Sequence, residues 1–189
     1  MHHSGIDRIM KTRAKTQQTS ALPKRRIVSS SHLVSEKSPE LSELEFGLII
    51  ASHAFNRWLV RCVSAAGIKD MTPVDVLVLH HINHRNSEKR LADICFVLNI
   101  EDTHVVSYSI KKLLGMGLLT NTKRGKEVFY ATSTAGIALC ERYRQVREEC
   151  LLPVFLGQET ENQQLGEIAR LLRTLSGRYD QAARAATSF

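Results

Sequence analysis

The sequence predicts a mainly α-helical protein with one short β-hairpin. Three observations carry this prediction: apolar residues recur at helical spacing along most of the chain, capping residues delimit the helices, and β-branched and aromatic residues flank one glycine turn. The 189 residues are 43% hydrophobic, which suits one well-packed domain plus an extension. We expect residues 40–189 to form the domain and residues 1–39 to be a disordered basic extension.

The basic character of the chain is unevenly distributed. Of the formal charge of +7, residues 1–40 carry eight Lys/Arg against three Asp/Glu, whereas residues 41–189 carry 18 against 16. The domain is nearly balanced, so a basic surface on it would be local. The cluster Lys24-Arg25-Arg26 in the extension suits a solubilising tail, with an additional phosphate contact as the alternative.

Long helices are expected at both ends of the domain. The first runs from about residue 41 to 66, and two more run from 134 to about 150 and from about 159 to 176. The last repeats apolar residues at heptad-like spacing, at Leu165, Ile168, Leu172 and Leu175. Such stripes lack a partner within one chain, so we expect N- and C-terminal dimerisation helices at about 41–66 and 134–176.

Capping signals place three helices between these ends. Thr72-Pro-Val-Asp75 is a capping box with proline at the first helical position, and it opens a helix that reaches roughly His84. A helix over 90–98 ends at Asn99, a residue that tolerates a left-handed backbone. Asp102 then caps a helix over 103–116, which Gly117 stops.

The helix over 103–116 and the segment after it are predicted to form a polar, cationic surface. From residue 103 to 126 there are five Lys/Arg and no Asp or Glu, and a hairpin with the tip Lys-Arg-Gly-Lys follows the helix. The order of helix, turn, helix and basic hairpin predicts a winged helix-turn-helix that binds double-stranded DNA, the helix in the major groove and the cations on phosphates. The expected contacts are Thr103, His104, Ser107, Tyr108, Lys111, Lys112, Lys123, Arg124 and Lys126.

The run from Asp102 to Leu113, followed by Gly-Met-Gly-Leu-Leu119, the hairpin and Ser133-Thr-Ala-Gly136, resembles the MarR family of bacterial transcription regulators. The resemblance extends over residues 41–175. It departs from the family at Tyr108, where arginine is frequent, and at the wing, which is shorter and lacks the usual Asp-x-Arg tip. It implies a homodimer that regulates transcription at a pseudo-palindromic operator, with a DNA-binding lobe at about 71–133.

The resemblance also implies an effector pocket between the dimerisation helices and the DNA-binding lobe. His53, Arg57 and Trp58 lie toward that region, and a tryptophan beside an arginine suits an aromatic carboxylate, although a tryptophan in a dimer core is the simpler interpretation. His80 and His84 are four residues apart, as two metal ligands would be, but no third ligand is evident. A metal-responsive sensor and a winged-helix protein-interaction scaffold therefore stay as alternatives.

The sequence contains no motif that indicates catalysis or metal binding by cysteine. The four cysteines form no metal-ligand spacing, and no phosphate loop, nucleophile elbow or paired-carboxylate site appears. We therefore expect no enzymatic activity, no cofactor and no resident metal. With no secretory signal and no apolar run of membrane length, we expect a cytoplasmic protein with reduced thiols and no membrane partner.

Overall fold

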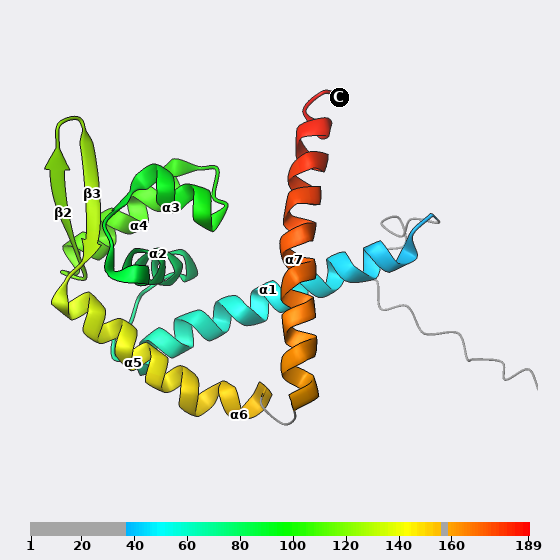
Figure 1. Ribbon diagram of the computed structural model, residues 1–189, viewed down its shortest axis with the longest axis horizontal. Coiled ribbons are helices and arrows are strands. Elements are labelled where there is room, and N and C mark those ends of the chain that lie inside the picture. The colour runs from blue at the N-terminus through cyan, green and yellow to red at the C-terminus, as the bar shows by residue number, and fades with distance from the viewer. Residues whose placement is uncertain (1–36, 156–158) are drawn as a thin grey trace, which may run out of the picture. The chain divides into compact units, whose positions relative to one another are not determined.

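The structure is a computed structural model that describes residues 37–155 and 159–189 (Figure 1). Residues 1–36, nearly all of the expected basic extension, lie outside the described part. The chain divides into two compact units, Met1–Ile50 and Ala51–Phe189. The first contributes the start of one helix, and the second contains every other element.

The architecture is mainly helical with one small sheet, as the sequence predicted. The helices are α1 (Pro39–Ala65), α2 (Pro73–Asn83), the 3₁₀ turn η2 (His84–Asn86), α3 (Leu91–Leu98), α4 (Thr103–Gly115), α5 (Thr134–Cys150), α6 (Leu152–Phe155) and α7 (Glu159–Ala186). The strands are β1 (Lys89–Arg90), β2 (Leu119–Arg124) and β3 (Glu127–Thr132). Among the described helices, none is both long and apolar enough to cross a membrane.

The hydrophobic core of the second unit holds α2, α3 and α4 together. Its fully buried side chains come from each of these helices and from α1 and α5, and include Val63, Val76, Leu79, Ile82, Ile94, Val106, Ile110, Leu113 and Leu139. Fully burying one such aliphatic side chain is worth about 1.5–3 kcal/mol relative to leaving it exposed. Helix α4 is thus held in place by its buried apolar face, which leaves its opposite, polar face outward.

The capping predictions are confirmed. Thr72 and Asp75 exchange side-chain and backbone hydrogen bonds in a capping box, with Pro73 as the first helical residue. Asn99 ends α3 with a left-handed backbone at φ 52°, and the Asp102 carboxylate accepts the His104 amide hydrogen at 2.9 Å. These caps fix both ends of the turn between α3 and α4.

The sheet is antiparallel, with the strand order β1-β3-β2. The β2–β3 hairpin closes through Gly125 and Lys126, and Gly125 has a φ of +62° at the first of the two turn positions, which type II′ hairpin turns reserve for glycine. Strand β1 pairs Lys89 with Tyr130 and Arg90 with Phe129. The sequence did not predict β1, because a two-residue strand leaves no alternating pattern.

A close backbone contact joins the hairpin to α5. The Ser133 side chain caps α5 by accepting the Gly136 amide hydrogen and also donates to the Gly117 carbonyl at 2.7 Å. A Cβ atom on Gly136 would lie 2.1 Å from the Leu118 carbonyl oxygen, far inside van der Waals contact. Glycine is therefore required where α5 leaves the sheet.

The C-terminal helix is longer than the sequence predicted. Helix α7 continues ten residues beyond Ser176, through Gly177 and the alanine-rich stretch that ends at Ala186. A Cβ on Gly177 would meet nothing within 4 Å. One glycine in an exposed helix costs only about 1 kcal/mol relative to alanine, which the good helix formers after it offset.

Candidate nucleic-acid interface

Helix α4 separates its residues cleanly into two faces. The face toward the core carries Val106, Ser109, Ile110 and Leu113. His104, Tyr108 and Lys111 follow one another at i, i+4 and i+7 on the opposite face, and Tyr108 is 72% exposed. These three side chains are the part of the helix farthest from the core. A hydrogen-bonding ring, a phenol and an ammonium in one line suit contacts with base edges and phosphates.

Thr103 and Ser107 lie on one flank of this outward face. Thr103 is exposed and Ser107 is half-buried, so their hydroxyl groups border the row of His104, Tyr108 and Lys111. The structure thus brings five of the six predicted helix residues to one side of α4.

Lys112 is the exception, because its ammonium group turns toward the inside of the lobe. It bonds the Asp75 carboxylate at 2.7 Å and also donates to the Asp70 carbonyl. The Asp75 side chain is only 2% exposed. Burial opposes ionisation of Asp75, yet the bonds from Lys112 and Thr72 hold its pKa below the usual range. Lys112 is therefore engaged in a buried ion pair and is not part of the outward face of α4.

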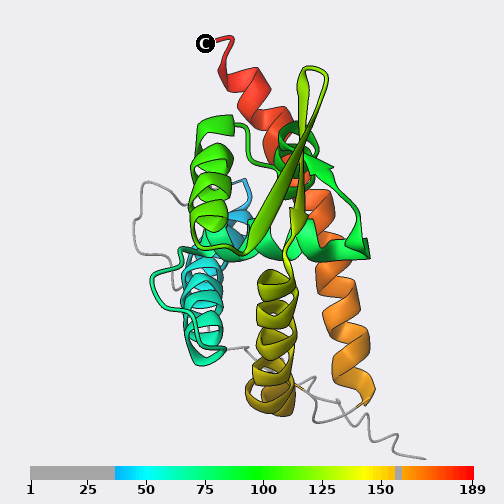
Figure 2. The same ribbon diagram turned by 90° about the vertical axis from the view of Figure 1, so that its left-hand side faces the viewer.

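The wing hairpin lies beside α4, as both views of the fold show (Figure 1, Figure 2). Lys123 and Lys126 are exposed, Lys123 near the end of β2 and Lys126 in the turn. Within the described part of the chain, neither they nor Lys111 make a hydrogen bond or ion pair. These three ammonium groups are free for a polyanion.

Arg124 differs from these lysines because it is already paired. Its guanidinium contacts the Glu88 carboxylate at 2.7 Å and lies 5.0 Å from the centre of the Phe129 ring. Next to it, Arg90 bonds both Asp93 at 3.0 Å and Glu127 at 2.9 Å. These bonds connect the hairpin to β1 and α3.

The two faces of the sheet consequently differ in charge. Successive side chains of a strand alternate between faces, so Arg124, Glu127, Phe129 and Arg90 share one face and Lys123 lies on the other. On the first face each arginine has a carboxylate partner. Sequence reasoning missed Glu88, Arg90 and Glu127, since only the pairing of β1 with β3 reveals that they lie beside the wing.

The predicted effector residues do not come together in one pocket. Trp58 lines an apolar cavity of about 650 Å³, whose other lining residues are Ala51, Ala54, Phe55, Arg147, Leu151, Leu152, Phe155, Asn162 and Leu165. Arg57 instead lines a separate groove with Asn56, Val60, Arg61 and Pro73. His53 is exposed and shares its helix face with Arg57, four residues on, not with Trp58. The arginine beside Trp58 is therefore Arg147, from α5.

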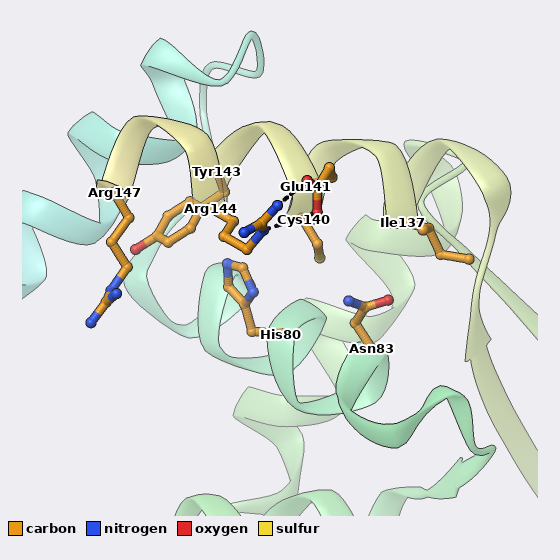
Figure 3. A pocket seen from close by; sticks show the side chains of 8 residues that line it. All are labelled: His80, Asn83, Ile137, Cys140, Glu141, Tyr143, Arg144 and Arg147. Atoms are coloured by element: carbon orange, nitrogen blue, oxygen red, sulfur yellow. Dashed lines mark hydrogen bonds and ion pairs between the residues drawn. The ribbon is translucent and has the colours of Figure 1, made fainter. Parts of the chain in front are cut away.

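The histidine pair also lacks the expected geometry. Helix α2 ends at Asn83, and His84 is its extended C-cap, so His80 and His84 do not lie on one helix face. Figure 3 shows the His80 ring pointing from α2 toward α5, where it packs edge-on against Tyr143 with ring centres 4.4 Å apart. Burial lowers the pKa of His80, because it disfavours the charged form of the ring. In the described residues no three His, Cys, Asp or Glu side chains are grouped as metal ligands.

The comparison with known families agrees with this geometry. Residues 71–136 match a family described as winged helix DNA-binding domain. The matched range begins just before α2 and ends in the first turn of α5, so it contains α4 and the whole wing. No curated protein matches the chain in sequence.

Solved structures of transcription regulators share the fold at low sequence identity. A cysteine-to-serine mutant of MarR from E. coli, complexed with operator DNA, is 17% identical and covers 73% of this chain and 99% of its own, with a TM-score of 0.59. Reduced AbfR bound to DNA, a protein of Staphylococcus epidermidis, is 18% identical and covers 75% of this chain and 97% of its own, with a TM-score of 0.60. The transcriptional repressor CouR, bound to a 23-mer DNA duplex, is 22% identical and covers 73% of this chain and 99% of its own, with a TM-score of 0.58. The chain therefore has the winged-helix fold of the MarR-family regulators, as its sequence resemblance predicted.

Proposed function

We propose that the protein is a transcription regulator that binds double-stranded DNA through α4 and the β2–β3 wing. One observation carries the proposal: His104, Tyr108 and Lys111 form the outermost row of α4, next to a hairpin with two lysines that have no partner among the described residues. A helix of this kind fits the major groove of B-DNA, and the adjacent cations meet the phosphates. The operator-bound MarR and the DNA-bound CouR of the same fold support this assignment.

The proposal assigns different roles to the cations and to the polar side chains. Lys111, Lys123 and Lys126 would contact phosphates, with Lys111 also within reach of guanine, whereas His104 and Tyr108 would meet base edges. Thr103 and Ser107 would support them from the flank. Lys112 is excluded from this set, since releasing it would leave the buried Asp75 carboxylate unpaired.

We further propose that the protein acts as a homodimer on a pseudo-palindromic operator. Of the predicted heptad residues of α7, Leu165, Ile168 and Leu172 are each more than one-third exposed, as is the neighbouring Leu171, whereas Leu175 is buried at 8% exposure. Such a stripe would be buried by the same surface of a second copy in a two-fold interface. Two copies of α4 related by a two-fold would then contact half-sites about one helical turn of DNA apart, or a multiple of it.

The apolar cavity next to Trp58 suggests how an effector would act. Phe55, Trp58 and Phe155 supply aromatic walls, and Arg147 supplies a cation, so the site suits an organic acid with an aromatic body. An acid bound there would affect DNA affinity if it favoured one spacing of the two α4 helices. Benzoate and naphthoate should raise the melting temperature of the wild type but not of Trp58→Ala or Arg147→Gln. No shift with either acid would contradict the effector proposal.

The DNA-binding proposal is tested by titrating duplexes at several salt concentrations. Lys111→Gln or Lys123→Gln should weaken binding to every duplex and flatten the dependence on salt by up to about 0.9 per lost phosphate contact. His104→Ala or Tyr108→Ala should instead reduce the preference for a selected duplex over a scrambled one. Absence of salt-dependent binding by the wild type would contradict the proposal and favour a protein-interaction scaffold.

A further inference from the structure

The outward side of α4 carries apolar surface as well as hydrogen-bonding groups. Tyr108 is 72% exposed, and Val105, about one helical turn before it, is 42% exposed. Side chains three residues apart are neighbours on a helix surface, so the valine and the phenol ring adjoin. The helical repeat places Val105 beside the row of His104, Tyr108 and Lys111, on the flank opposite Ser107. The row is therefore bordered by hydroxyl groups on one side and by an aliphatic group on the other.

This apolar pair is not used by the rest of the lobe. Val106 and Ile110 already fill the core side of α4, where each is at most 2% exposed. The Tyr108 hydroxyl group makes no hydrogen bond with the described residues, and Val105 has no group that could donate or accept one. Both side chains are thus free to contact a molecule that lies against the outward side of α4.

Resting on the proposed DNA-binding function, we propose that Val105 and Tyr108 are specificity-determining residues that recognise the 5-methyl group of a thymine. The major groove presents hydrogen-bond donors and acceptors on every base pair but only one apolar group, which is the thymine methyl. A valine or phenol ring placed against the cytosine amino group or guanine O6 would displace water there without replacing its hydrogen bond. The pair therefore favours a thymine at the position that it contacts.

The tyrosine also limits how α4 can recognise guanine. Strong selection of guanine uses two parallel N–H donors of one side chain, which bond O6 and N7 together. A phenol has a single hydroxyl group and makes at most one of these bonds, whereas most of its surface is the apolar ring. Contact between the ring and a methyl group is consequently the interaction by which Tyr108 discriminates most between bases.

Replacing thymine by uracil tests the proposal, because uracil lacks the methyl group and keeps the hydrogen-bonding groups of the base. The probe is the duplex selected by the wild type, in which each thymine is replaced in turn by deoxyuridine and titrated at one salt concentration. At least one position in each half-site should lose about three- to fivefold in affinity, the factor expected for one buried methyl group. No loss at any thymine, or a selected duplex without thymine, would overturn the proposal.

Variants of the two residues show whether the loss comes from this pair. At the sensitive position, Tyr108→Ala and Val105→Ala should each reduce the ratio of thymine to uracil affinity, whereas Tyr108→Phe keeps the ring and should keep the ratio. Val97→Ala is the matched control, since it truncates a valine of α3 that is 59% exposed, and should leave the ratio at its wild-type value. A ratio that Tyr108→Ala or Val105→Ala leaves unchanged, or that Val97→Ala or Tyr108→Phe lowers as much, would overturn the role of the pair.

Failure of the proposed function gives a different result. A wild type that binds no duplex in a salt-dependent way contradicts DNA binding itself, and the thymine contact with it. Salt-dependent binding to a selected duplex, with no sensitivity to the methyl group, overturns the thymine contact alone.

Discussion

Helices α4 and α7 are both amphipathic, but within the described part of the chain α4 buries its apolar face far more completely than α7 does. Val106, Ile110 and Leu113 of α4 are at most 2% exposed, whereas Ile168 and Leu171 of α7 are each 52% exposed. Helix α4 is accordingly held by its own lobe and can present its polar face without a partner. Helix α7 has the same kind of stripe, but in the described part of the chain only its Leu175 end is buried, and Leu165 to Leu172 stay largely exposed. The difference supports the proposed homodimer, in which each copy would present its own α4 and the exposed part of the α7 stripe would meet a second copy.

Two glycines, one beside the lobe that holds α4 and one in α7, should differ sharply in their tolerance of a side chain. Gly136→Ala should destabilise the lobe by about 3 kcal/mol or more, because its methyl group would collide with the Leu118 carbonyl oxygen. Gly166→Ala in α7 meets nothing within 4 Å and should stabilise the helix by about 0.5–1 kcal/mol. Urea unfolding of both variants measures the contrast. Equal stability of the two variants would show that the lobe does not require the close approach.

The apolar stripe of α7 should determine the oligomeric state. The double substitution Ile168→Asp and Leu172→Asp places charges in the stripe and should convert a dimer into monomers, measured by sedimentation. Loss of the two-site contact should then lower affinity for a two-half-site duplex by at least about a hundredfold. Glu167→Gln, on an exposed residue of the same helix, serves as the control. A dimer that survives the double substitution would contradict the interface.

The neighbouring lysines of α4 should separate stability from DNA binding. Lys112→Met leaves the buried Asp75 carboxylate without its ion-pair partner and should cost about 2 kcal/mol of unfolding free energy, since Lys112 is itself partly exposed. Lys111→Met should change stability by no more than about 0.5 kcal/mol while weakening DNA binding. Chemical denaturation of both variants tests the effect on stability, and duplex titration tests the effect on DNA binding. If the two lysines exchange these effects, the faces of α4 are assigned wrongly.

The smallest expected effect is the pH dependence of the contact between α2 and α5. Burial lowers the pKa of His80 below the ordinary histidine value of 6.5, so the unfolded chain binds its proton more readily than the folded one. Stability should therefore be complete above about pH 6.5 and should fall as the pH drops below that value. His80→Gln should flatten this slope, as measured by unfolding at pH 7.5 and pH 5.5. His81, whose pKa burial also lowers, retains a part of the slope in that variant.

Sequence reasoning worked where local chemistry decides the structure. Asp102 and Asn99 cap their helices for reasons contained in their own side chains and backbone preferences, so the helix-turn-helix could be placed from the sequence. The hairpin followed from Gly125 in the same way. The outward row of α4 was also predicted, because the helical repeat alone places His104, Tyr108 and Lys111 opposite the buried face.

The rest depends on contacts between distant segments. The helical repeat places Lys111 on the outward face, but only the contact with Asp75, 37 residues away, reveals that the neighbouring Lys112 turns inward. The sequence predicted Arg124 as a DNA-contacting cation of the wing, but the fold pairs its guanidinium with the Glu88 carboxylate. The helix pattern through residue 84 suggested one face for His80 and His84, but α2 ends at Asn83. Sequence spacing carries none of this information.

Sequence-specific recognition through α4 can be tested by selection from a random duplex library, followed by titration of the selected and a scrambled duplex at several salt concentrations. Wild-type protein and Lys111→Gln would be compared throughout. We expect an enriched inverted repeat, a preference over the scrambled duplex that persists as salt rises, and a flatter salt slope for the variant. Equal binding to every duplex, lost as salt rises and unchanged by the substitution, would contradict sequence-specific recognition through α4.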